Sequence, residues 1–165
     1  MFEAAMSHYD MNLSVKQGLV NIFAAGLYHL FEQQVQEFHF KALYGERFRY
    51  AVDTLKKWNE ILGTPLPEKV KAELDELREL ANTVKHGDGS AAQKLYKLNP
   101  TLFQNEWERD EPEDFGVIVH KPEVFAPMYG QDIYLQIEDV RRFQALVTQL
   151  WEHYFNLFIQ PSTIR

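Results

Sequence analysis

The residues best suited to chemistry lie close together, near residue 80. They are Arg78, Glu79, Asn82, Lys85 and His86. Histidine can act as an acid or a base near neutral pH, and an arginine can hold a phosphate with two hydrogen bonds. Lys85 could add positive charge, and Asn82, one turn before His86, could orient the imidazole or a substrate. These residue types suit an active site for phosphate chemistry, with His86 as the acid or base.

A helix predicted from about Glu68 to His86 would position these residues. On this helix Asp75, Glu79, Asn82 and His86 fall within about 60° of one another, at 100° per residue. The apolar residues on the opposite side are Leu74, Leu77 and Ala81. We therefore expect this polar row to face away from the core, toward water or a dimer partner. The alternative is an ordinary solvated helix face, with a C-terminal histidine favoured by the helix dipole.

Residues 77–89, LRELANTVKHGDG, resemble the signature helix of the HEPN superfamily, small all-helical bundles common in bacterial toxin–antitoxin and antiphage systems. That signature is an arginine followed by a histidine after four to six residues, often with an asparagine next to the arginine. Here seven residues separate Arg78 from His86, and Asn82 does not follow the arginine. The resemblance implies a homodimer that cleaves RNA without a metal, with Arg78 and His86 as the catalytic pair. Asn82, Lys85 and Glu79 would support them.

Apolar periodicity predicts the remaining elements. The main helices are expected at about 13–43, 45–62, 68–86 and 138–159, with a short helix at 90–98. The inner face of the first helix is predicted to consist of Val20, Phe23, Leu27, Leu30, Phe31 and Phe38. Short apolar or alternating runs at 115–119 and 132–137 predict a β-ribbon. The expected fold is mainly α, a four-helix-type bundle with a small β-ribbon insertion before the last helix. It forms one domain over residues 1–165.

Composition narrows the class of protein. The chain has no cysteine, which excludes disulfides, thiolate metal sites and cysteine catalysis, and suits a reducing compartment. The net charge of −7 argues against broad nucleic-acid affinity, although a mildly basic stretch at 41–98 leaves room for a small RNA contact. No signal peptide or long uncharged apolar run is present. We expect a cytoplasmic protein with no cofactor, metal site or membrane contact.

Two functional hypotheses are consistent with these patterns. The first is an HEPN-like, metal-independent endoribonuclease or effector of a toxin–antitoxin or antiphage system. The second is a non-catalytic helical module that binds a protein, as an immunity or scaffold component, and the acidic loop at 106–114 favours it. The apolar residues from Val140 to Phe158 cover more than one helix face, which predicts self-association through the last helix or through the His86 face. His29 and Glu32, one turn apart, could line the same cleft as His86.

Overall fold

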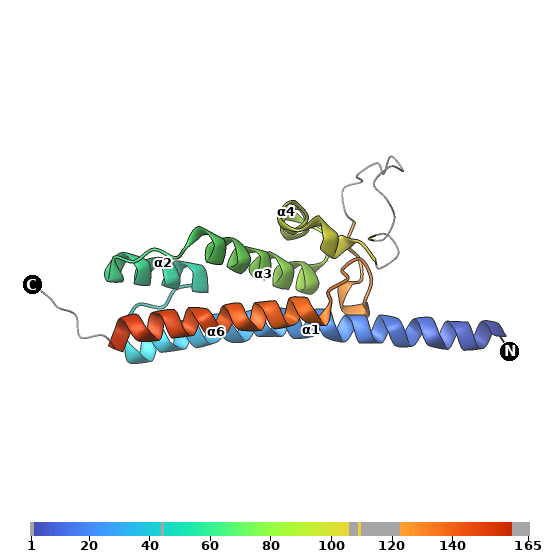
Figure 1. Cartoon of the computed structure of the whole chain (residues 1–165), viewed down its shortest axis with the longest axis horizontal. Helices are drawn as coiled ribbons and strands as arrows, with labels where there is room; N and C mark the ends of the chain where they lie inside the picture. Colours follow the sequence, from blue (N-terminus) through green and yellow to red (C-terminus); the bar gives the residue numbers. More distant parts are fainter. Residues whose placement is uncertain (1, 44, 106–108, 110–122, 160–165) are drawn as a thin grey trace, which may run out of the picture.

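A computed structural model describes residues 2–43, 45–105, 109 and 123–159 (Figure 1). The helices are α1 (Phe2–Ala42), α2 (Ala51–Leu62), α3 (Glu68–His86), α4 (Ser90–Leu98) and α6 (Ile137–Ile159). Two short 3-10 helices, η1 (Pro100–Phe103) and η2 (Pro127–Tyr129), lie in the connections. The described ranges contain no strand. The prediction of a mainly helical chain is confirmed.

The longest helices, α1 and α6, lie side by side and run in the same direction (Figure 1). Phe31 contacts Trp151 with ring centroids 6.2 Å apart, and further along both helices Phe38 contacts Phe158 at 5.6 Å. The shorter α2 and α3 follow one another along this pair (Figure 1). The body thus consists of α1, α6 and the α2–α3 row, where the sequence predicted a four-helix-type bundle.

Aromatic residues hold α1, α2 and α6 together. Trp58 of α2 has no exposed surface, and its ring lies 5.0 Å from that of Tyr154 and 5.3 Å from that of Phe158. The Tyr154 hydroxyl donates a hydrogen bond to Asn59 Oδ1 at 2.7 Å. Desolvation by burial raises the pKa of Tyr154 to about 12, so its hydroxyl stays protonated. The wide apolar surface of α6 is largely used inside the chain, although Phe155 stays exposed.

The segment before α6 differs from the prediction. Residues 132–136 form no strand, and Asp132 lies in a bend with a φ of 67°, so a β-ribbon is not confirmed there; residues 115–119 lie outside the described residues. Ile133 and Leu135 are buried, which explains the apolar alternation. Side chains of α1 supply the hydrogen bonds that a neighbouring strand would have supplied. The buried Asn21 amide donates to the carbonyl oxygens of Pro127 at 2.7 Å and Ile133 at 2.9 Å, and Gln17 donates to that of Leu135.

Two helix starts also differ. The first helix begins at Phe2 rather than near residue 13, and its first turns project beyond the rest of the body (Figure 1). The second begins at Ala51 rather than 45, because the chain must first reverse direction after α1. Gly45 donates a backbone hydrogen bond to the His39 carbonyl at 3.1 Å. It lies so close to the His39 ring that an added Cβ would clash with it.

Candidate functional site

Arg78 is held by two carboxylates of its own helix. Its Nη2 lies 2.9 Å from Glu79 Oε1 and 3.2 Å from Asp75 Oδ1, and its Nε also donates to Glu79. Desolvation alone would lower the pKa of Arg78, but the hydrogen bond to Glu79 and the charges of both carboxylates raise it above its usual value. The guanidinium is permanently charged, and that charge is already compensated.

The sequence predicted that the whole polar row of α3 faces away from the core. In the structure, part of this row is buried. Glu79 is only 4 % exposed and also lies 3.8 Å from Lys94 of α4. The prediction assumed that neighbouring helices cover only one side of α3, whereas α3 packs against α1, α4 and α6. Glu79 is therefore a buried carboxylate whose cationic partners, Arg78 and Lys94, are partly exposed.

His86 and Lys85 are exposed at the end of α3, and Asn82 is half-buried one turn earlier. Gly87 ends the helix with a φ of 72°, and its N–H donates to the Thr83 carbonyl at 2.8 Å. Arg78 lies two turns before His86, about 12 Å along the axis, and no contact between them is found in the part of the chain that the structure describes. The structure brings Arg78 and Glu79 together and leaves His86 apart from them.

The His29–Glu32 pair belongs to a different environment. His29 Nδ1 lies 3.7 Å from Glu32 Oε2 in α1, and Glu32 Oε1 accepts a hydrogen bond from the Ala51 N–H at 3.4 Å. Glu32 therefore meets the first residue of α2. The neighbouring Tyr28 is buried, and desolvation followed by the charge of Glu32 raises its pKa far above the usual value.

A surface that the sequence did not single out lies along α1. The inner face of α1 is formed by Ala24, Tyr28, Phe31 and Val35. Phe23 and Leu30, predicted to be buried, are 69 % and 54 % exposed. They belong to a row on the opposite side of the helix, which we call the α1 apolar face. Its members are Met11, Val15, Leu19, Ile22, Phe23, Gly26 and Leu30.

The sequence did carry a signal for this face. No Asp, Glu, Lys or Arg occurs between Lys16 and Glu32, so the helix is apolar on both sides over four turns. A helix that is apolar all round is usually buried all round. In the single chain, only one side of this stretch is covered.

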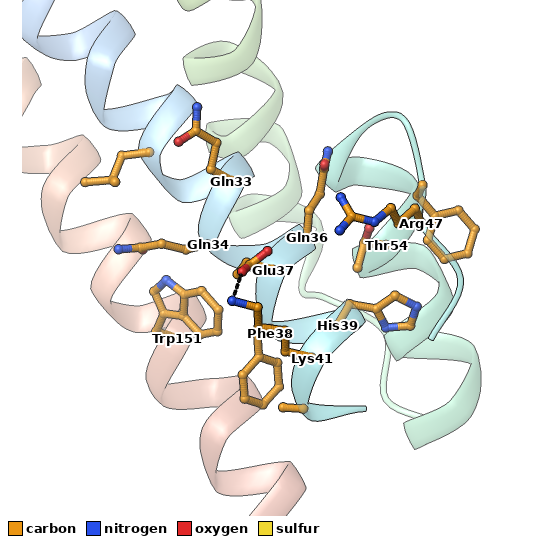
Figure 2. A pocket seen from close by; sticks show the side chains of 13 residues that line it. Gln33, Gln34, Gln36, Glu37, Phe38, His39, Lys41, Arg47, Thr54 and Trp151 are labelled. Carbon is orange, nitrogen blue, oxygen red and sulfur yellow. Dashed lines mark ion pairs between the residues drawn. The ribbon is translucent and has the colours of Figure 1, made fainter. Parts of the chain in front are cut away.

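A pocket of about 780 Å³ lies at the C-terminal end of α1, beside α2 and α6 (Figure 2). Glu37 and Lys41 form an ion pair at its mouth. His39 Nδ1 accepts a hydrogen bond from Trp58 Nε1 at 3.0 Å, and burial lowers the pKa of His39, so the ring is neutral. The buried Thr54 hydroxyl has no hydrogen-bond partner among the described residues. Among the described residues that line this pocket, no nucleophilic side chain is hydrogen-bonded to a base.

Within the described ranges, no group of three or more His, Asp or Glu residues is arranged to hold a metal ion. No helix in those ranges combines the length and apolar character needed to cross a bilayer.

Comparisons of the chain with protein-family models, with curated proteins and with solved structures find no match.

Proposed function

We propose that the protein is a non-catalytic helical binding module, of the immunity or scaffold kind, that works through the α1 apolar face in the cytoplasm. The observation that supports this most is the exposure of large apolar side chains on a continuous, uncharged side of α1. Monomers rarely expose contiguous apolar patches larger than a few hundred Å², and the largest patch of a monomer is often functional. A partner that covers this side would bury α1 on both faces.

The charges on α3 favour binding over catalysis. A transition-state phosphate needs a cation that is free to approach it, and the Arg78 guanidinium already bonds Glu79 and Asp75. Moving it to a substrate would leave Glu79, which is almost fully buried, without its closest partner.

Oxidative footprinting in cells tests whether α1 is covered. Met11 and Met128 are 47 % and 49 % exposed, and Phe23 and Phe125 are 69 % and 76 % exposed. Without a partner, each pair should react with hydroxyl radicals at similar rates, because reactivity follows exposure. We expect Met11 and Phe23 to react several-fold more slowly than Met128 and Phe125.

Met128 and Phe125 are the internal controls, since they lie on or beside η2 and outside the α1 apolar face. Equal rates within both pairs would show that the face is bare in the cell and would contradict the binding module.

The second candidate is an HEPN-like, metal-independent ribonuclease. The exposure of His86 and Lys85 beside Asn82 favours it, because an acid or base must reach its substrate. His86→Ala should then reduce cleavage of a labelled RNA in EDTA by about 10²–10⁴-fold. It should change the free energy of unfolding by less than about 0.5 kcal/mol, since the side chain is exposed.

Lys97→Ala is the matched control, an exposed basic residue in the last turn of α4. If the wild-type protein cleaves no RNA, the ribonuclease candidate is wrong. If the wild type cleaves and His86→Ala cleaves equally well, His86 is not the acid or base.

A further inference from the structure

We infer that the partner of the α1 apolar face is the same face of a second copy, packed antiparallel with a two-fold axis near Gly26. This inference rests on the proposed binding function and names its partner. A two-fold dimer uses one patch on both subunits, so the patch must be complementary to itself.

The central turns of the α1 apolar face meet this condition when it is reversed about Gly26, whereas Val15 and Met11 at its outer end then lie opposite Glu37 and Lys41 of the second copy. Ile22 then faces Leu30 of the second copy, and Leu19 faces Gln33, so no charged residue lies within the central turns. Gly26 is exposed, and a Cβ added to it would meet nothing within 4 Å. The helices can therefore approach closely where they cross.

Charge selects the antiparallel orientation. Lys16 and Glu37 lie about 60° apart around α1, on either side of the apolar centre along the helix, with Glu37 in line with Leu19. In an antiparallel pair, Lys16 of one copy lies near Glu37 of the other, whereas a parallel pair would place like charges together. Glu37 also pairs with Lys41 of its own helix, which offsets part of its charge.

The exposed apolar side chains supply about half of the area that each partner buries in a stable complex. The large side chains of the α1 apolar face are each about half exposed or more. A whole aromatic side chain has about 150–250 Å² of surface, so together they leave roughly 400 Å² of apolar surface in water. The polar flanks of a helix this long add to that area, toward the roughly 800 Å² per partner of a stable complex.

The projecting start of α1 is a separate reason for a second copy. Residues 8–13 are all exposed, and helix ends without packing are marginal in water. In the antiparallel pair these turns lie against the last turns of the second α1, where Phe40 is partly exposed.

This interface does not join the two His86 sites. The α3 helix packs on the opposite side of α1, against the face that contains Tyr28. A dimer formed through α1 therefore keeps the two α3 helices apart. The polar residues of α3 in one subunit do not meet those of the other subunit.

Single-cysteine crosslinking tests both the partner and its orientation, because the natural chain contains no cysteine. Gly26→Cys should be crosslinked to itself by a short bis-maleimide. Leu19→Cys alone should not, since antiparallel copies place the two thiols about 21 Å apart along the axis. A mixture of Leu19→Cys and Gln33→Cys should crosslink. Self-crosslinking of Leu19→Cys as efficient as that of Gly26→Cys would instead show a parallel pair and overturn the inference.

Light scattering gives the second readout. Wild-type protein at tens of micromolar should have twice the chain mass of 19.4 kDa, and Ile22→Glu should have the mass of one chain. Ile61→Glu, the same change at an exposed position of α2, should stay dimeric. Circular dichroism should show that both variants keep their helices.

A wild type with the mass of one chain overturns the second copy as partner. The footprint then separates the two proposals. Protected Met11 and Phe23 in a monomeric protein would mean that a different protein or a lipid surface covers the face, which leaves the binding function standing.

Discussion

Arg142→Met should lower the free energy of unfolding by about 3–5 kcal/mol, because it leaves a buried carboxylate without its counter-charge. Glu76 is buried in α3 and receives two hydrogen bonds from Arg142 of α6, at 2.7 and 2.9 Å. Asn99, which follows α4, donates a third at 2.9 Å. The pair therefore joins α3, α4 and α6, and the hydrogen bond to Glu76 raises the pKa of Arg142.

Urea denaturation at neutral pH would measure this loss. Arg141→Met is the matched control, since the Arg141 side chain is 73 % exposed and lies 3.5 Å from an equally exposed Glu138. Exposed pairs contribute little, so the control should differ from wild type by less than about 0.5 kcal/mol. Similar losses in the two variants would show that the buried pair has no special weight.

Gly18→Ala should destabilise the protein by about 1–3 kcal/mol, although alanine is the better helix former. A Cβ at this position would overlap the backbone carbonyl oxygen of Met128 and lie 3.2 Å from the nitrogen of Gly130. Because these are backbone atoms, α1 and the segment around η2 must move apart.

Gly26→Ala makes the same change two turns further along the same helix. Both changes are made in the Ile22→Glu background, so that no second copy covers Gly26 and the new methyl group meets nothing within 4 Å. It should stabilise the protein by about 0.5–1 kcal/mol, the usual gain of alanine over glycine in a helix. Thermal unfolding of the two variants should therefore shift in opposite directions. Two shifts of the same sign would contradict the close contact at Gly18.

The sequence predicted helices well where the chain itself marks their ends. The bounds of α3 and α4 agree with the prediction, because Pro67 precedes α3, Gly87 follows it, and Asn99-Pro100 ends α4. The start of α1 was missed because no comparable signal separates residues 2–12 from residues 13–42 of the same helix.

Periodicity could not predict which side of α1 is covered. Apolar residues surround the helix between residues 17 and 31, so Phe23 and Phe31 were equally good candidates for the core. Only the packing of α3 and α6 shows that Phe31 is buried and Phe23 is exposed.

The prediction of the candidate site failed for the same reason, because the sequence does not give the positions of neighbouring helices. Residue spacing alone placed Glu79 and His86 on one polar face of α3. The position of α4 decides that Glu79 is buried beside Lys94, while His86, the last residue of α3, stays in water.

The hydrogen bonds of Asn21 also affect how the chain folds during synthesis. Asn21 and Pro127 are 106 residues apart in the sequence. At about 5–20 residues per second, a ribosome needs on the order of 5–20 s after Asn21 to synthesise the residues whose carbonyl groups accept its hydrogen bonds. Until α3 has emerged and packed, the uncharged stretch from 17 to 31 is open on both sides rather than one, and its start around Asn21 stays open until residues 127–133 follow. The nascent chain should therefore depend on chaperones most strongly before residue 135 emerges, and much less afterwards.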